Sequence, residues 1–129
     1  MKNLSYLFLF IFALGLLGFW GLPWWTLVLI GLVAGWWFRP TAGTGFLGGF
    51  LAGFLLWGAL SIYLNWLNDG ILAARIGILF QGVGSATLIL VTGLFGGLLA
   101  SLAVLAGIYA REWAFPPKKG PYARRKRRR

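Results

Sequence analysis

The sequence contains no cysteine and no histidine, and only two acidic residues in 129 positions. The chain therefore has no thiol nucleophile, no disulfide, no thiolate or imidazole metal ligand and no imidazole general base. The two acids, Asp69 and Glu112, are far apart in the chain, and paired-carboxylate catalysis would require them to meet. We expect a protein that is not an enzyme and that binds no metal and no cofactor.

Apolar residues are abundant instead. They make up 60% of the chain, and the mean hydropathy is +0.82, whereas soluble domains are roughly 45–50% apolar. Eight of the twelve basic residues lie in the last fourteen positions, where there is no acid. An apolar domain over 1–115 and a basic tail over 116–129 predict an integral membrane protein whose C-terminus is cytoplasmic.

The N-terminal third contains two apolar runs, 4–20 and 24–38, separated by Gly21, Leu22 and Pro23. A single helix over both runs would be about 52 Å long, against a hydrocarbon core of about 30 Å. Proline is disfavoured inside a helix but suits its first turn, so we expect a hairpin of two short spans. Tryptophans mark both ends of this hairpin, as an interfacial aromatic belt does: Trp20, Trp24, Trp25, Trp36 and Trp37.

Two longer apolar runs predict two further spans, over 44–66 and 85–113. The polar segment 68–70 predicts a turn after the first of them. Ser85 is placed to cap the N-terminus of the second span, and the two prolines at 116–117 end it. The sequence thus predicts four transmembrane helices.

Residues 71–82 connect these two longer spans. Four of their apolar side chains share one helical face, namely Leu72, Ile76, Leu79 and Phe80. Arg75 lies beside that face, so we expect a short amphipathic helix on the external membrane surface. The alternative is a re-entrant segment that leads into the last span.

Charges near the ends of the spans orient the bundle. Lys2, Arg39 and the tail fall on one side of a four-span bundle, whereas Asp69 and Arg75 fall on the other. The positive-inside rule then places both termini in the cytoplasm. The competing interpretation makes 1–20 a cleaved signal peptide, but the run has no small-x-small site free of bulky neighbours.

Small residues recur at every fourth position on three of the predicted spans. The rows are Gly31 and Gly35; Gly45, Gly49 and Gly53; and Gly93, Gly97 and Ser101. Positions four apart share a helix face, and small residues there let two backbones approach closely in lipid. We expect the last two spans to pack against each other through their rows. The alternatives are a face presented to another subunit or copy, and a pore lined by glycine backbone.

No ionisable side chain lies deep in any predicted span. Active transporters generally need such groups near the midplane, so this class is disfavoured. In the external loop, Asp69 and Arg75 are placed to form an exposed ion pair. Alternatively, Arg75 contacts a lipid headgroup or an acidic partner.

The tail contains Pro and Gly near its start and is predicted to be disordered. Its basic residues are Lys118, Lys119, Arg124, Arg125, Lys126, Arg127, Arg128 and Arg129. We expect them to contact anionic lipid headgroups, each contributing about 1 kcal/mol near the surface. An acidic partner protein is the alternative. Nucleic acid is disfavoured, because Tyr122 is the only aromatic residue of the tail that could stack on a base.

Three stretches carry a resemblance to known proteins: 50–57; 72–80, from Leu72-Ala73-Ala74-Arg75 to Leu79-Phe80; and 92–98, followed by Gly107. Together they are similar to a pattern in small uncharacterised bacterial inner-membrane proteins, over residues 45–111. The resemblance implies no activity. The segment 45–50 also resembles part of the four-span fluoride channels, but the hydroxyl residues and the N-terminal motif of those channels are missing.

We therefore expect an all-α, multi-pass protein of the bacterial inner membrane, with both termini in the cytoplasm. Its expected function is that of a small scaffold or accessory subunit of a larger membrane complex, in contact with a membrane-protein partner or with further copies of itself. The alternative is a self-associating passive pore, similar in outline to a holin or a small channel.

Overall fold

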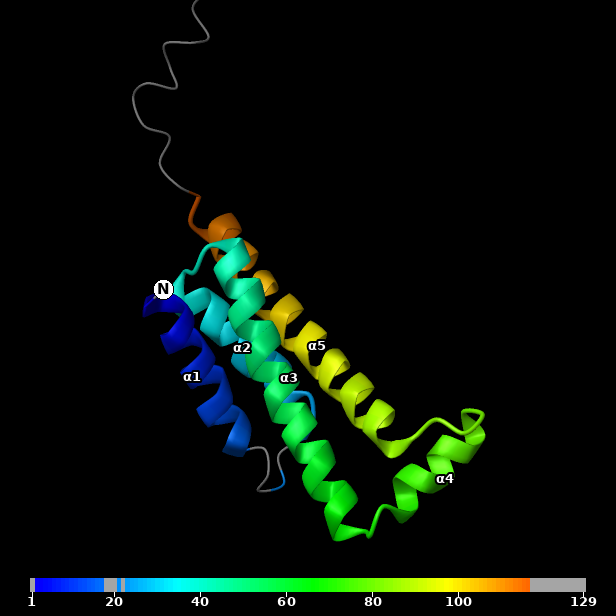
Figure 1. Ribbon diagram of the computed structural model, residues 1–129. Helices are drawn as coiled ribbons and strands as arrows, with labels where there is room; N and C mark the ends of the chain where they lie inside the picture. The colour runs from blue at the N-terminus through cyan, green and yellow to red at the C-terminus, as the bar shows by residue number, and fades with distance from the viewer. Residues whose placement is uncertain (1, 18–20, 22, 117–129) are drawn as a thin grey trace, which may run out of the picture.

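The computed structural model describes residues 2–17, 21 and 23–116. It consists of five α-helices, α1 (Lys2–Leu16), α2 (Thr26–Phe38), α3 (Ala42–Leu67), α4 (Ile71–Leu79) and α5 (Ser85–Ala114) (Figure 1). The predicted all-helical fold is confirmed for this part of the chain. Trp20 and the basic tail, including its predicted disorder, lie outside the described residues.

The helices of the N-terminal hairpin are shorter than the apolar runs that predict them. Helix α1 ends at Leu16, and α2 begins only at Thr26, whose backbone N–H donates to the Pro23 carbonyl oxygen at 3.0 Å. At 1.5 Å per residue, α1 is about 22 Å long and α2 about 20 Å, less than a core of about 30 Å. Two described helices, α3 and α5, are long and apolar enough to cross a membrane.

Local signals set the ends of the longer helices. Helix α3 begins after Thr41, whose Oγ1 accepts a hydrogen bond from the Thr44 backbone N–H at 3.4 Å. The predicted cap of α5 is wrong by one residue. Gly84, in an extended conformation, is the N-cap, and Ser85 is already the first helical residue.

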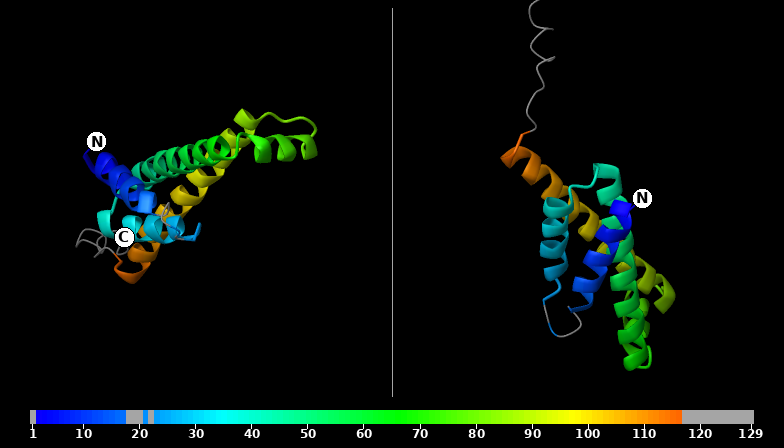
Figure 2. Two further views of the ribbon diagram at one scale, coloured as in Figure 1. Left: turned by 90° about the horizontal axis from the view of Figure 1, so that it is seen from below. Right: turned by 90° about the vertical axis from the view of Figure 1, so that its left-hand side faces the viewer.

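Helices α3 and α5 run antiparallel through the centre of the molecule (Figures 1 and 2). Helix α4 connects the C-terminal end of α3 to the N-terminal end of α5. Helix α1 packs mainly on α3, and α2 mainly on α5. The start of α1 and the end of α5 lie at the end of the bundle opposite α4 (Figure 1). The core between the four longer helices consists of Leu7, Ile11, Leu27, Ala34, Ala52, Leu56, Ala100, Val104 and Ile108.

Helix α4 is shorter and less one-sided than the sequence pattern suggests. It ends at Leu79, and the backbone N–H of Gly82 donates back to the Gly77 carbonyl oxygen at 2.8 Å. Ile71 and Ile78 share the helical face of Arg75, because residues three and four apart lie on one side of a helix. Both isoleucines are exposed. Helix α4 therefore exposes apolar side chains beside its one charge.

Candidate functional site: two glycine seams and an uncharged groove

The glycines of α3 lie against the backbone of α5. A Cβ atom added at Gly49 would lie 2.9 Å from the Ser101 Cα, and one added at Gly53 would lie 2.4 Å from the Gly96 carbonyl oxygen. At Gly45 the nearest atom would be the Ile108 Cδ1, at 2.7 Å. We call this contact the α3–α5 seam. It brings the two predicted rows to one interface and leaves no room for a side chain at Gly53.

Aromatic side chains of α3 cover the glycines of α5 along the same seam. A Cβ atom at Gly97 would lie 3.0 Å from the Phe50 ring, and one at Gly93 would lie 3.2 Å from the Phe54 ring. The two phenylalanine rings stack, with centroids 6.0 Å apart. The remaining member of the row, Ser101, is buried and donates its hydroxyl to the Leu98 carbonyl oxygen at 2.9 Å. The glycines of α5 therefore leave room for phenylalanine rings of α3, whereas the glycines of α3 leave room for the backbone of α5.

A second close contact, between α2 and α5, was not predicted from the sequence. A Cβ atom at Gly35 would lie 2.1 Å from the Val104 carbonyl oxygen, and one at Gly107 would lie 2.1 Å from the Leu32 carbonyl oxygen. We call this contact the α2–α5 seam. The spacing of Ala103 and Gly107 by four residues was the available signal. Helix α5 thus packs on two sides, against α3 and against α2.

The acidic side chains of the described chain form no site. Asp69 and Arg75 both belong to the described residues, and both side chains are exposed. They form no ion pair with each other. The predicted external ion pair is therefore absent from this part of the chain. Glu112 lies in the last turn of α5, and Asp69 lies in the turn between α3 and α4. The end of α5 and the α3–α4 turn are at opposite ends of the bundle (Figure 1). The described residues contain no group of three or more His, Cys, Asp or Glu side chains that could hold a metal ion.

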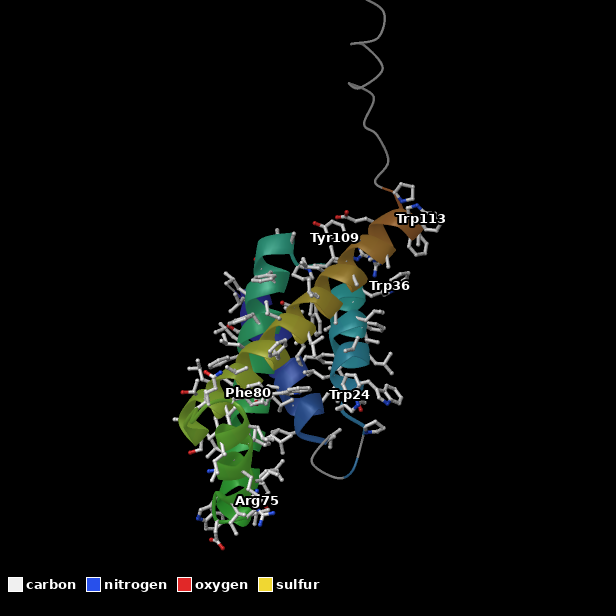
Figure 3. All side chains as sticks on the ribbon, turned by 90° about the vertical axis from the view of Figure 1, so that its right-hand side faces the viewer. Trp24, Trp36, Arg75, Phe80, Tyr109 and Trp113 are labelled. Atoms are coloured by element: carbon white, nitrogen blue, oxygen red, sulfur yellow. The ribbon has the colours of Figure 1, made fainter. Side chains whose placement is uncertain are left out.

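Of the residues predicted to contact lipid, Arg75 alone belongs to the part of the chain that the structure describes. Arg75 lies on α4, at the end of the molecule away from Trp36, Tyr109 and Trp113 (Figure 3). The basic residues of the tail, 118–129, lie outside the described residues. Figure 3 shows the labelled aromatic residues at two positions along the bundle: Trp36 and Trp113 lie near one end, and Trp24 and Phe80 lie farther toward the other end, at about the same height.

An open groove of about 510 Å³ runs between the end of α1, α2, α3, α4 and the start of α5. Its volume lies within the range of about 300–1,000 Å³ that is typical of small-molecule sites. Its lining residues are uncharged: Gly15, Pro23, Trp24, Thr26, Leu27, Ile30, Leu56, Trp57, Leu60, Ser61, Leu64, Asn65, Asn68, Leu72, Ala73, Ile76, Leu88, Ile89 and Thr92. Sequence reasoning missed this groove, because its walls come from five separate helices.

The polar side chains of the groove differ in their hydrogen bonding. The Asn68 Nδ2 donates to the Leu64 carbonyl oxygen at 2.8 Å, and the Thr92 Oγ1 donates to the Leu88 carbonyl oxygen at 2.8 Å. The Asn65 Oδ1, in contrast, is buried and has no hydrogen-bond partner among the described residues. The side chains of Asn68 and Thr92 are thus hydrogen-bonded to backbone carbonyl groups, whereas the Asn65 oxygen is hydrogen-bonded to no described residue.

Comparisons with protein-family models, with curated proteins and with solved structures found no match to this chain. The resemblance to small inner-membrane proteins remains an expectation from the sequence. The geometry of the seams and of the groove is therefore the basis for a functional proposal.

Proposed function

We propose that this chain is a multi-pass protein of the bacterial inner membrane that serves as a non-catalytic scaffold or accessory subunit of a membrane complex. The outward-facing apolar surface supports the membrane location. Only 28% of the most apolar window of α3 and 39% of that of α5 are buried inside the molecule. A core helix of a soluble protein is mostly buried, so these outer faces need hydrocarbon.

The proposed topology has four spans, with both termini in the cytoplasm. Two features support it. The start of α1 and the end of α5 lie at the same end of the bundle (Figure 1), and Trp24, at the α1–α2 turn, lies at the height of Phe80, which precedes α5 (Figure 3). The hairpin thus reaches about as far along the bundle as α5 does. The short helices α1 and α2 then require local thinning of the bilayer.

One observation disfavours a pore through a single copy of the chain. At both seams the backbones are so close that a single added Cβ at Gly35 or Gly53 would overlap a carbonyl oxygen. Such contacts close the inside of one copy to ions and solutes. A partner protein would therefore contact the exposed apolar exterior of the bundle.

Expression of the full chain, followed by purification in mild detergent, tests this proposal. We expect the protein to accumulate in the membrane fraction without making cells leaky, and to purify with a membrane protein in fixed ratio, identified by mass spectrometry. A matched sample of the Gly53→Leu variant controls for nonspecific capture, because that substitution should disrupt the α3–α5 seam. Dye leakage from cells that express the wild type would instead favour the alternative, a self-associating passive pore.

A further inference from the structure

Two arginines lie at the C-terminal end of α2, which is the end of the bundle opposite α4. Arg111 of α5 donates a hydrogen bond to the carbonyl oxygen of Trp36, in the last turn of α2, at 2.6 Å. Arg39 directly follows the last residue of α2, three positions after Trp36. Residues with this spacing lie on one side of a helix, with their Cβ atoms about 5–6 Å apart. The Arg111 guanidinium and the start of the Arg39 side chain are thus about one helical turn apart.

No acidic side chain of the described chain neutralises these two arginines. The Arg39 side chain is exposed and makes no hydrogen bond or ion pair with any residue that the structure describes. Glu112 is the acid nearest in the sequence, and it pairs with neither arginine. Because like charges at this separation repel each other, an anion bound between them removes an unfavourable interaction.

The Arg111 guanidinium is held in one place and still has donors to offer. It lies 5.8 Å from the centroid of the Trp36 ring and 6.0 Å from that of the Phe115 ring. Its hydrogen bond to Trp36 uses only Nη1, and its other N–H groups bond to none of the described residues. A guanidinium in a fixed orientation suits an anion with several oxygens, because it can bind two of them through parallel hydrogen bonds.

The backbone of Arg39 adopts a conformation that glycine usually occupies. Its φ of 49° and ψ of 47° lie in the left-handed region, which costs free energy for a residue with a Cβ atom. A charge that only orients the chain in the membrane needs no particular backbone position. Strained residues of this kind cluster at ligand-binding sites. Binding of a ligand therefore accounts for an arginine at this position better than orientation does.

Aromatic side chains surround the two arginines, as they do at the headgroup level of a membrane. Trp36 and Trp113 lie near this end of the bundle (Figure 3), and the side chains of Trp37 and Trp113 are exposed. The anion that is abundant at this level is the phosphodiester group of a phospholipid. Two unpaired cations also favour a lipid with a net negative charge over a zwitterionic one.

We propose that Arg39 and Arg111 form a site for the phosphodiester group of an anionic phospholipid, such as phosphatidylglycerol, in the cytoplasmic leaflet. This inference rests on the proposed membrane location and topology. Fractionation of the expressed protein tests the location separately, and binding to the purified protein is measured without a membrane, so the two proposals can fail independently.

The test uses the purified full chain in mild detergent and three probes: dioctanoylphosphatidylglycerol, dioctanoylphosphatidylcholine and inorganic phosphate. A ligand that binds only the folded state raises the melting temperature in a concentration-dependent way. We expect the phosphatidylglycerol to bind about tenfold more tightly than the phosphatidylcholine, whose head carries a positive charge. Equal binding of the two lipids would overturn the proposal. An equal response to inorganic phosphate would show a site for a free anion and overturn the assignment to a lipid.

Two variants of Arg39 separate binding from folding. Arg39→Gln should melt near the wild-type temperature without lipid, because the side chain makes no contact that is lost, but it should bind phosphatidylglycerol about tenfold more weakly. Arg39→Gly should lose the same affinity and yet melt higher without lipid, because glycine adopts a positive φ without strain. Wild-type affinity in a folded Arg39→Gln variant would refute the site.

The matched control is Arg75→Gln. It removes the same charge from α4, where no second basic residue of the described chain lies. It should change the affinity for phosphatidylglycerol by less than about twofold, since a lone exposed charge contributes little. The basic residues of the tail are present in every variant, so their attraction for the lipid is the same in each comparison. Equal weakening by Arg39→Gln and Arg75→Gln would show that net charge alone attracts the lipid, and it would overturn the proposal.

Discussion

The Arg111 side chain of α5 donates a hydrogen bond from Nη1 to the Trp36 carbonyl oxygen of α2, at 2.6 Å. Trp36 lies in the last turn of α2, where carbonyl groups lack intrahelical partners. The residue four positions later is Pro40, which has no N–H to offer. The guanidinium therefore supplies the donor that the chain itself cannot, and it also lies 5.8 Å from the centroid of the Trp36 ring.

Replacing Arg111 should consequently loosen the end of the bundle that holds both α2 and α5. We expect Arg111→Met to lower the free energy of unfolding by about 1.5–3 kcal/mol, the range for hydrogen bonds to charged groups. Arg111→Lys should lose less, because an ammonium group can still donate. The control is Arg75→Met, since Arg75 is exposed and should change stability by less than about 0.5 kcal/mol. Thermal unfolding in detergent measures all three variants, and equal melting temperatures would contradict the assignment.

The α3–α5 seam gives a matched pair of glycine substitutions on one helix. A Cβ at Gly53 would lie 2.4 Å from a carbonyl oxygen, whereas a Cβ at Gly58 would meet nothing within 4 Å. Gly53→Ala should therefore destabilise the protein by about 1–3 kcal/mol through overpacking. Gly58→Ala should stabilise it by about 0.5–1 kcal/mol, because alanine is the better helix former. Unfolding in detergent with increasing denaturant measures both, and the same sign for the two variants would refute the packing account.

The basic tail gives a prediction that rests on its charge alone. Deleting residues 118–129 removes eight basic residues and no acid. The protein held in nanodiscs of neutral lipid should then bind vesicles of phosphatidylglycerol more weakly, since each basic residue contributes about 1 kcal/mol near an anionic surface. High salt should shrink the difference through screening. Co-sedimentation that is equal for the two proteins at low salt would show that the tail does not contact anionic lipid.

The sequence was sufficient for the helices and for the contact between α3 and α5, but not for the contact between α2 and α5. Apolar runs punctuated by Pro23, by Pro40 and by the polar turn at 68–70 predict each helix nearly in place, because these residues act locally. The rows on α3 and α5 also meet as expected. A small-xxx-small row does not reveal which helix it faces, so the contact of Gly35 with Val104 could not be foreseen.

Contacts between residues far apart in the sequence could not be predicted either, because local patterns do not show which helices meet. The hydrogen bond from Arg111 to Trp36 joins residues 75 positions apart, and no local pattern encodes such a pair. The groove is formed by five helices, and Asn65 becomes notable only because its oxygen is buried without a partner among the described residues. Sequence reasoning placed the polar residues on the right helices, but it could not tell a satisfied side chain from an unsatisfied one.

The central claim, that the hairpin of α1 and α2 crosses the membrane together with α3 and α5, can be tested by cysteine accessibility, because the chain has no native cysteine. Trp24, Ala42 and Ala74 are exposed and lie before α2, at the start of α3 and on α4. Single variants Trp24→Cys, Ala42→Cys and Ala74→Cys would be treated with a membrane-impermeant maleimide in spheroplasts and again after permeabilisation. We predict that positions 24 and 74 are labelled from outside and position 42 only after permeabilisation. Labelling of positions 24 and 42 from the same side would contradict the four-span account.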